Sequence, residues 1–470
     1  MAEDLPTLRP VACVGEESRC EPWPLMPDGT KWDGKDLLTL VRDGRSPFGN
    51  VWDVELLFRE VEDHAHGTII DIPKVHNGAN HYGFQIKLSD QREVLARLSR
   101  ADMNVPNYDG YSETWLHNLI EFEAAVYHLL EDTVGIPTSR LIYFRHAIQS
   151  KGPNEELPKD SISGRRLMIF EMSKDNKPLW RVLSKHQKSS LLTQAAKSRA
   201  ALLNKELPTT FVANWILWTS FQPVEWMPKM FPLPPAATRD FCISMLKAKV
   251  EALIGDVGDS IGWAVDKQTV GPRAFAAKQS LLRLIPLILP AESDNDDALY
   301  RLVLQHDDFG IHNMSVYVDE QTGDLMLNSV YDWETGCIVP AILSEVDFLI
   351  YGRDFKLFVG ERGKPSVYTR PDVELEPERR VQDQEHAVEF VNAIYEYAPH
   401  MKEILRVGSD ARKLWSTLKR WQGDDPEEFF GELGLWAAAR VSDLVADTLP
   451  SAANSPISED GTLVKHPGSM

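Results

Sequence analysis

One short segment, residues 304–313, constrains this chain more than any other. It reads LQHDDFGIHN, and His306, Asp308 and Asn313 in it follow the pattern HxDxxxxN directly after an apolar run. A second apolar run leads to another acid, Asp332, in the sequence VYDWE. Carboxylate and amide oxygens suit a divalent cation such as Mg²⁺, and a further carboxylate can accept a proton from an attacking hydroxyl. The two segments together predict phosphoryl transfer, with Asp308 as the base and Asn313 and Asp332 as metal ligands.

Other interpretations of these two segments remain open. The HxDxxxxN pattern has few fixed positions, so the prediction depends on the second acid, whose order and distance match a kinase metal-binding loop. The first alternative is a pair of surface turns, in which Asp308 caps a turn and Asp332 ends a strand. A second alternative is a metal-dependent hydrolase that uses His306, Asp308 and His312. Oxygen ligands around phosphate favour magnesium over such a site.

The same hypothesis requires a small lobe with a turn that lies over phosphates. Residues 76–98 predict a β-hairpin, because Phe84 and Ile86 alternate toward one face and a second apolar strand follows. Gly78 and Asn80 lie in the turn before Phe84, where small residues let backbone N–H groups approach a nucleotide. An ordinary hairpin turn is the alternative for this segment.

A cation on the strand after this turn should reach the nucleotide phosphates, and Arg97 is placed for that role. An acid on the following helix must hold it there. Residues 113–132 predict such a helix, because their apolar side chains recur at helical spacing before a terminating Gly-Ile-Pro. Glu121 and Glu123 point in different directions on this helix, and we expect Glu123 to face Arg97. A solvated helix face is the alternative for either glutamate.

A hinge between two lobes is predicted where the apolar strand at residues 166–172 runs into a polar segment. The backbone of Glu171 and Met172 is expected to hydrogen-bond the edge of an adenine, with Phe170 and Met172 on either side of the ring. An edge strand that leaves the core is the alternative.

With these motifs the chain resembles the aminoglycoside phosphotransferase and choline kinase family of protein-kinase-like small-molecule kinases, especially its large fungal-type branch. The resemblance covers roughly residues 65–350. It implies an α+β, bilobal protein-kinase-like fold with a small β-rich N-lobe and a large, mainly helical C-lobe. It also implies ATP and Mg²⁺ as cofactors. Matched position by position, it implies a catalytic Asp308, a nucleotide site of Gly78, Asn80, Arg97, Glu123, Glu171 and Met172, and the metal ligands Asn313 and Asp332.

The catalytic loop departs from the commoner pattern of that family. The common loop has Gly between its His and Asp and Gly before its Asn, where this chain has Asp307 and His312. Arg97 stands where lysine is frequent, which keeps the charge and changes its reach. Two functions follow from the resemblance. One is an ATP-dependent phosphotransferase that acts on a hydroxyl of a small molecule. The other is a catalytically impaired kinase-like protein that binds nucleotide or acts as a scaffold.

Composition along the chain predicts four segments. We expect an N-terminal arm and helical lead-in at residues 1–64, a nucleotide-binding N-lobe with hinge at 65–172, a helical C-lobe at 173–450 and a disordered tail at 451–470. The aromatic, proline-rich segment 215–235 forms either a wall of the acceptor site or the edge of a core, and its density of rings favours the core.

Charge and cysteine content narrow the partners and the compartment. The 50 basic and 70 acidic residues leave a net charge of −20, which argues against nucleic-acid binding and suits a cationic small-molecule acceptor. Four scattered cysteines, without disulfide or zinc spacing, favour a reducing compartment. The chain shows no apolar run of the ~20 residues needed to span a bilayer and no secretory signal pattern. We therefore expect a cytoplasmic protein that acts on a small molecule without membrane association, and no feature indicates an oligomeric state.

Overall fold

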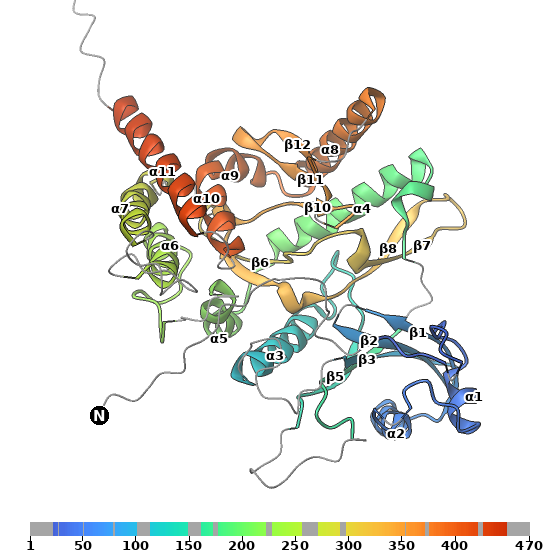
Figure 1. The fold of residues 1–470 in the computed structure, drawn as a ribbon. Coiled ribbons are helices and arrows are strands. Elements are labelled where there is room, and N and C mark those ends of the chain that lie inside the picture. The colour runs from blue at the N-terminus through green and yellow to red at the C-terminus, as the bar shows by residue number, and fades with distance from the viewer. Residues whose placement is uncertain are drawn as a thin grey trace, which may run out of the picture.

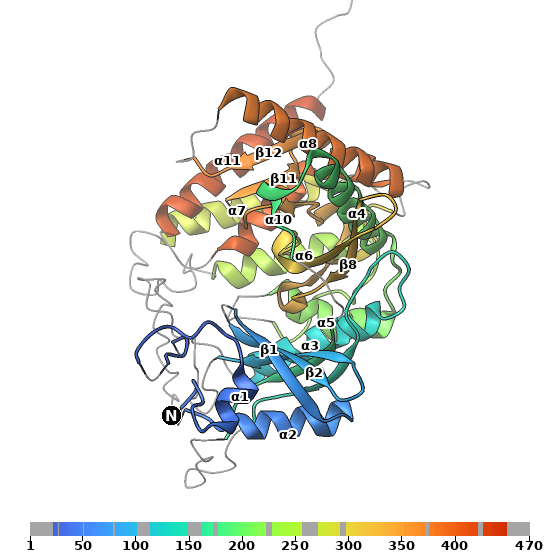
Figure 2. The same cartoon turned by 90° about the vertical axis from the view of Figure 1, so that its right-hand side faces the viewer.

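The structure, a computed structural model, places two lobes against each other (Figures 1 and 2). It describes residues 22–26, 28–49, 51–78, 80–100, 113–148, 161–172, 177–221, 228–255, 271–291, 298–352, 354–371, 376–421 and 426–448. Most of the expected arm and the whole of the expected tail lie outside these ranges. The N-lobe is built around a sheet and the C-lobe mainly from helices. The predicted α+β, bilobal architecture, with a small β-rich N-lobe and a large, mainly helical C-lobe, is confirmed.

Five antiparallel strands form the N-lobe sheet in the order β1-β2-β3-β5-β4. They are β1 (Ile69–Asn77), β2 (His81–Leu88), β3 (Glu93–Ser99), β4 (Leu141–Arg145) and β5 (Leu167–Glu171). Buried side chains alternate with partly exposed ones along β2, as expected for a strand with one face on a core. The predicted hairpin is present as β2 and β3, with Phe84 opposite Ala96.

The N-terminal lead-in packs onto this sheet. Its two helices, α1 (Leu37–Arg42) and α2 (Val54–Ala65), share one apolar core with β1, β2 and β3. Trp23 stacks on Trp32 with ring centroids 5.5 Å apart, and it also lies 5.9 Å from the ring of Tyr82 in β2. The predicted helical lead-in is present, and it packs on the strands of the N-lobe.

Helix α3 (Glu113–Leu130) connects the N-lobe to the core of the C-lobe. Its buried Phe122 and Val126 belong to the same apolar cluster as the C-lobe helices. The chain turns after the helix at Gly135, whose φ of +86° favours glycine. The predicted helix over residues 113–132 is thus confirmed and ends two residues earlier.

The C-lobe contains α4 (Lys185–Asn204), α5 (Thr209–Ser220), α6 (Arg239–Leu253), α7 (Gly271–Ile288), α8 (Pro377–Tyr397), α9 (Met401–Val407), α10 (Ser409–Arg420) and α11 (Pro426–Thr448). A capping box starts α4, because Ser184 and Gln187 each accept a hydrogen bond from the backbone N–H of the other. Helix α11 packs along α7, and α8 packs along α4 (Figure 1). The mainly helical C-lobe that the sequence predicts for this part of the chain is present.

Aromatic side chains of the segment at residues 215–235 are buried in the core, among them Trp218, Phe221 and Phe231. Trp218 packs 5.5 Å from Phe122 of α3, and the rings of Phe221 and Phe231 lie 5.8 Å apart. The prediction of a core edge is confirmed for these residues, while residues 222–227 lie outside the described ones.

Two short strand pairs carry the polar loops. β6 (Leu302–Gln305) pairs with β9 (Cys337–Pro340), and β7 (Met314–Val318) pairs with β8 (Leu325–Val330). The loop between β6 and β7 holds the HxDxxxxN segment, and the loop between β8 and β9 holds Asp332. Because the strands at both ends of these loops are paired, the two loops lie side by side.

A third C-lobe sheet supports the first of these loops. Its strands are β10 (Phe348–Leu349), β11 (Phe355–Val359) and β12 (Pro365–Thr369). The N–H of Leu349 donates to the carbonyl oxygen of Phe309 in the loop, at 2.9 Å. The described residues also form short 3₁₀ turns: η2 (Trp180–Val182), η4 (Ile311–Asn313), η5 (Trp333–Thr335), η6 (Ala341–Leu343) and η7 (Glu361–Gly363). Within the described residues, no helix combines the length and apolar character that crossing a bilayer requires.

Candidate active site

Asp308 and Asn313 are in direct contact within the loop between β6 and β7. The Nδ2 of Asn313 donates to the backbone carbonyl oxygen of Asp308 at 3.1 Å and to its carboxylate Oδ2 at 3.0 Å. The Nε2 of His312 lies 2.9 Å from the same Oδ2. Burial raises the pKa of Asp308, but the hydrogen bonds and the charge of His312 outweigh it and leave this pKa below its ordinary value. Asp308 is therefore an oriented carboxylate at neutral pH.

His306 links this loop to its neighbour. Its Nε2 lies 2.9 Å from the carbonyl oxygen of Tyr331, and the N–H of Asp308 donates to its Nδ1 at 3.2 Å. Burial lowers the pKa of His306 to about 4, so the ring is neutral, and its partners assign the proton to Nε2. Because both ring nitrogens are occupied, His306 does not fit the metal-ligand role that the hydrolase interpretation gives it.

Asp332 begins the second loop in a left-handed backbone conformation, with φ 69° and ψ 57°. Such a conformation is uncommon for a residue other than glycine, and neighbouring contacts must hold it. The N–H of Asp332 donates to the hydroxyl of Tyr127 on α3 at 3.2 Å, and the N–H of Tyr331 donates to the carbonyl oxygen of Asn313 at 3.1 Å. The second loop is thus bonded both to α3 and to the catalytic loop.

The guanidinium of Arg97 joins the two lobes. Its Nη1 donates to Oε1 of Glu123 at 2.7 Å, and its Nη2 donates to Oδ1 of Asp332 at 2.9 Å. The Glu123 side chain is 4% exposed and that of Arg97 13%, so this contact is largely shielded from water. The predicted choice of Glu123 over Glu121 agrees with these contacts, because Glu121 instead lies 2.7 Å from His146.

The turn before β2 reaches the same loop. The N–H of Gly78 donates to the carbonyl oxygen of His81 at 3.0 Å, and a Cβ on Gly78 would lie 2.6 Å from that oxygen. Only glycine therefore fits the closed turn. The Nδ2 of Asn80 donates to Oε1 of Glu334 at 3.2 Å, and burial together with nearby carboxylates raises the pKa of Glu334 to about 7. Ala79, between the two, lies outside the described residues.

The backbone N–H groups expected at the hinge are used within the N-lobe. The N–H of Glu171 donates to the carbonyl oxygen of Arg140, and the N–H of Met172 donates to that of Glu93, each at 2.9 Å. The carboxylate of Glu171 also pairs with the guanidinium of Arg140. In this structure neither N–H is directed at an adenine.

Phe170 does not flank a nucleotide, so that part of the hinge prediction is wrong. Its ring is buried and lies 4.8 Å from the ring of Tyr127 on α3. The physical reason is strand alternation: the side chain of Phe170 points to the face of β5 that packs on α3. The polar residues 173–176 after the hinge lie outside the described residues.

Sequence reasoning missed the partners of Asp307, although it noted the residue as a departure. The carboxylate of Asp307 pairs with the ammonium of Lys419 on α10 and accepts a hydrogen bond from Nε2 of Gln305 at 2.5 Å. The Nζ of Lys419 also lies 3.3 Å from Sγ of Cys337. The sequence around Lys419 does not indicate this contact, because its partners are distant in the chain. Asp307 lies in the loop after β6, and Cys337 lies in β9.

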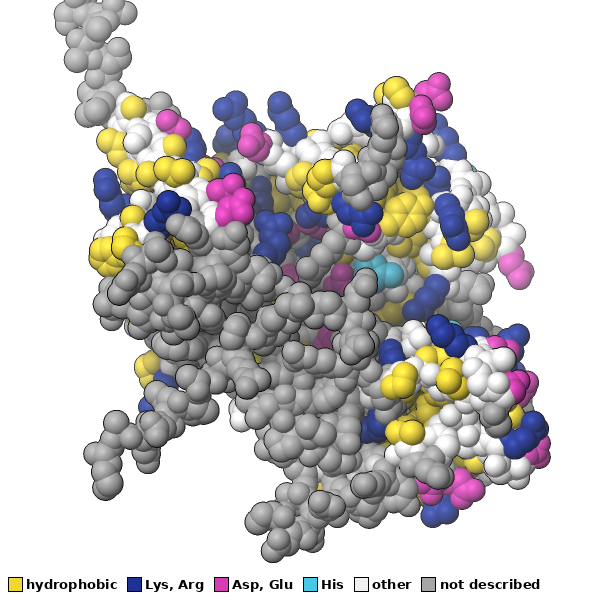
Figure 3. Space-filling view, viewed as in Figure 1, with side chains coloured by type: hydrophobic (Ala, Val, Ile, Leu, Met, Phe, Trp, Pro, Cys, Tyr) yellow, Lys and Arg dark blue, Asp and Glu magenta, His cyan; other side chains and the backbone are white. Residues whose placement is uncertain are grey.

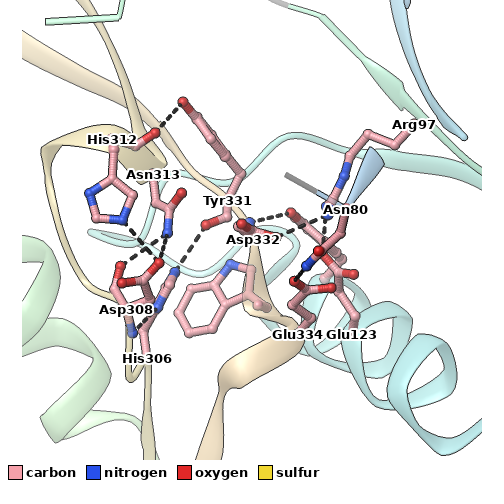
Figure 4. A network of polar contacts seen from close by, with 12 residues as sticks. Asn80, Arg97, Glu123, His306, Asp308, His312, Asn313, Tyr331, Asp332 and Glu334 are labelled. Carbon is pink, nitrogen blue, oxygen red and sulfur yellow. Dashed lines mark hydrogen bonds and ion pairs between the residues drawn. The ribbon is translucent and has the colours of Figure 1, made fainter. Parts of the chain in front are cut away.

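Figure 4 shows two groups of side chains on either side of Tyr331. Asp308, His312 and Asn313 gather on one side, and Arg97, Glu123, Asp332, Glu334 and Asn80 gather on the other. The amide oxygen of Asn313 points away from Asp308, since its nitrogen faces that carboxylate. Among the described residues, no group of three or more His, Cys, Asp and Glu side chains is arranged to hold a metal. A cation here would depend on few protein oxygens.

No family model and no curated protein matches this sequence. Solved structures do match it. The ADP-bound aminoglycoside phosphotransferase APH(2'')-Ib is 12% identical, over 83% of this chain and 99% of that chain, with a TM-score of 0.41. The streptomycin–ATP complex of APH(2'')-IIa is 11% identical, over 82% of this chain and 95% of that chain, with a TM-score of 0.40. An amicoumacin kinase in complex with AMP-PNP and Ca²⁺ is 9% identical, over 83% and 94%, with a TM-score of 0.34.

These matched structures are small-molecule phosphotransferases and kinases. They belong to the group that the sequence motifs resemble. TM-scores of 0.34–0.41 are too low to carry an argument about function. The side-chain contacts of the site indicate the function instead. Membership of the fungal-type branch stays a prediction.

Proposed function

We propose that this protein transfers the γ-phosphoryl group of ATP to a hydroxyl group of a small molecule. One observation carries the proposal: His306 bonds the loop of Asp308 and Asn313 to the loop of Asp332. A proton acceptor and two candidate metal ligands therefore occupy one rigid unit. Phosphoryl transfer depends on such positioning more than on covalent chemistry by the protein.

Asp308 is the base in this proposal. The acceptor hydroxyl attacks the γ-phosphorus, its proton passes to the carboxylate of Asp308, and the bond from phosphorus to the ADP oxygen breaks. The lowered pKa of Asp308 keeps it ionised and ready to accept that proton. Asn313 and His312 both hold Oδ2, and we assign Oδ1 to the acceptor hydroxyl.

Asn313 and Asp332 are the residues that would hold Mg²⁺. Their donors, one amide oxygen and one carboxylate, are the hard oxygens that this ion prefers, and it commonly takes its remaining ligands from phosphates and water. A bound Mg²⁺ would supply positive charge against the phosphate oxygens. Arg97 contacts Oδ1 of Asp332, and Oδ2 is the oxygen that we assign to the ion.

The remaining nucleotide contacts come from the N-lobe. Arg97 positions the phosphates and is held by Glu123, which removes most of its rotational freedom. The turn of Gly78 and Asn80 covers the phosphates, because Asn80 already bonds to Glu334 in the loop below. Glu171 and Met172 are assigned to the adenine of the nucleotide.

An acceptor screen tests this function directly. Purified protein with ATP and Mg²⁺ is incubated with a panel of hydroxyl and amine compounds, and mass spectrometry detects added phosphate. Asp308→Ala should bind nucleotide and lose turnover, while Glu320→Gln, an exposed acid in the hairpin after the loop, should behave as wild type. Unchanged turnover in Asp308→Ala would remove this residue from the mechanism. ATP binding without consumption across the panel would support the nucleotide-binding scaffold instead.

A further inference from the structure

The backbone of Asp332 adopts a conformation that this residue does not favour by itself. Its φ of 69° and ψ of 57° lie in the left-handed region, which residues other than glycine populate sparsely. The direction of the carboxylate depends on this conformation, because the Cβ turns with the backbone. A contact that holds the conformation therefore also orients the carboxylate that we assign to the metal.

The hydroxyl of Tyr127 on α3 provides such a contact. It accepts a hydrogen bond from the N–H of Asp332 at 3.2 Å. Tyr127 is 2% exposed, and its ring lies 4.8 Å from the buried ring of Phe170 in β5. This packing fixes the position of the hydroxyl. A hydrogen bond to a fixed acceptor favours the backbone conformation that forms it, and loss of the acceptor leaves the N–H without this partner.

Helix α3 holds the side chain of Asp332 as well as its backbone. Glu123 and Tyr127 are four residues apart, so they lie on one face of the helix. Glu123 accepts a hydrogen bond from Nη1 of Arg97 at 2.7 Å, and Nη2 of the same guanidinium donates to Oδ1 of Asp332 at 2.9 Å. One helix face therefore fixes Asp332 in two ways, directly through its N–H and indirectly through Arg97.

Tyr127 is too deeply buried to contact a ligand itself. Its exposed fraction is 2%, whereas the side chain of Asp332 is 34% exposed. Figure 3 shows acidic side chains within the hollow of the C-lobe, with Lys and Arg side chains around it. A ligand from solution can therefore reach the carboxylate of Asp332, and Tyr127 can act on that ligand only through Asp332.

We propose that Tyr127 is a positioning residue for the metal, because its hydroxyl holds the N–H of Asp332 and so keeps the carboxylate directed at Mg²⁺. This inference rests on the proposed phosphotransfer and on Asp332 as a metal ligand. No sequence pattern indicates Tyr127, since its partner is the backbone of a residue 205 positions later. Partners that orient a metal ligand typically change metal affinity by about 10–100-fold when they are removed.

Tyr127→Phe tests this role, because it removes the hydroxyl and keeps the ring that packs on Phe170. Calorimetry measures the affinity for AMP-PNP in excess EDTA and at a series of Mg²⁺ concentrations. In the variant, the Mg²⁺ concentration that gives half of the full gain in affinity should rise about tenfold. The affinity in EDTA should stay within about twofold of wild type. A purely structural role would instead weaken binding in both conditions.

Tyr300→Phe is the matched control. Tyr300 is 1% exposed, and its hydroxyl donates to the carbonyl oxygen of Pro290, so this variant also loses one buried hydroxyl. Its AMP-PNP affinity and Mg²⁺ dependence should equal those of wild type. Tyr127→Leu, which also lacks the hydroxyl, provides the same test if Tyr127→Phe does not fold.

The double variant Tyr127→Phe/Asp332→Asn assigns the effect to Asp332. Asp332→Asn removes the charged ligand, so the further change Tyr127→Phe should not alter the Mg²⁺ dependence again. Equal losses in both backgrounds, or a wild-type Mg²⁺ dependence in Tyr127→Phe, would overturn the role of Tyr127 and leave phosphotransfer standing. Wild-type AMP-PNP binding that does not depend on Mg²⁺ would instead overturn the metal assignment itself.

Discussion

Asp307 and Asp308 are adjacent in the sequence, and their surroundings differ at every contact. Asp308 faces Asn313 and His312 in its own loop, which His306 bonds to the loop of Asp332. Asp307 pairs with Lys419 on α10, a helix that comes much later in the sequence. The partners of each aspartate, and not its residue type, therefore decide whether it is a candidate base or a member of an ion pair.

The wider surroundings continue the same contrast. In front of the loop, contacts come from both lobes, and the carboxylates of Asp332, Glu123 and Glu334 cluster around one guanidinium, that of Arg97. Behind the loop, contacts come from the C-lobe alone, and bases exceed acids. The front suits a cation bound to phosphates, and behind the loop the ion pair of Asp307 and Lys419 joins the loop to α10. The following predictions test this division.

The largest expected difference lies between the two aspartates themselves. Asp308→Asn should lower kcat by about 10²–10⁴-fold, the usual contribution of a positioned general base. Asp307→Asn should leave kcat within about threefold of wild type, because the partners of Asp307 are Lys419 and Gln305. Steady-state kinetics of both variants with the best acceptor provide the measurement. Equal losses of kcat in the two variants would remove the distinction.

The second-largest effect is expected at Arg97, which lies in front of the loop. Arg97→Met removes the contact to Glu123 and the assigned phosphate contact, so MgATP should bind about 10–100-fold more weakly. Arg92→Met is the control, because Arg92 pairs with Asp90 at the exposed start of β3. Titration calorimetry with MgADP checks both variants. Wild-type affinity in Arg97→Met would place the phosphates elsewhere.

Behind the loop, Lys249 should lower the stability of the fold in a pH-dependent way. Its folded pKa of about 7 lies below the ordinary lysine value, so between pH 7 and about 10 the unfolded chain binds one more proton. Wild type should therefore gain stability relative to Lys249→Met as pH rises in this window, by up to about 1.4 kcal/mol per pH unit. At pH 7 and below, Lys249→Met should be the more stable protein.

Urea midpoints at pH 7, 8 and 9 measure this effect, with Lys247→Met on the same helix as the control. The groups facing Lys249 are Phe221, Trp415, Cys337 and Lys419. Burial raises the pKa of the Cys337 thiol to about 12, so this thiol stays neutral across the window. A stability difference between Lys249→Met and wild type that does not change with pH would contradict the prediction.

The smallest effect is expected at the turn over the front of the site. Asn80→Ala removes one partly solvated hydrogen bond to Glu334, so the affinity for MgADP should fall by about two- to fivefold. Asn77→Ala, on the other side of Gly78, should change this affinity less. Equal affinities of the two variants would show that the contact with Glu334 does not help to bind nucleotide.

The residues in front of the loop could be predicted from sequence because local rules place them. The spacing from His306 to Asn313 fixes the catalytic loop. Helical periodicity lets only one of Glu121 and Glu123 face Arg97, and the distance to the Ile-Pro after the helix favours Glu123. The hinge was predicted less well, since the pairing of β5 uses the N–H of Glu171 and turns Phe170 into the core.

The region behind the loop could not be predicted in the same way. Lys419 and Lys249 sit on amphipathic helices, where a lysine ordinarily indicates a solvated face. Lys249 is buried between Phe221 and Trp415, and Lys419 is partly buried against Asp307 and Cys337, all of them distant in the sequence. A single sequence does not encode that packing in any local pattern.

Our central claim is that Asp308 accepts a proton and Asp332 binds the metal. Calorimetry of ATP binding with and without Mg²⁺ tests it most directly. Wild type and Asp308→Asn should both bind ATP at least about tenfold more tightly when Mg²⁺ is present, since their metal ligands are intact. Asp332→Asn should lose this difference. ATP affinity that is independent of Mg²⁺ in wild type, or an Asp308→Asn variant that behaves like Asp332→Asn, would contradict the assignment of the two acids.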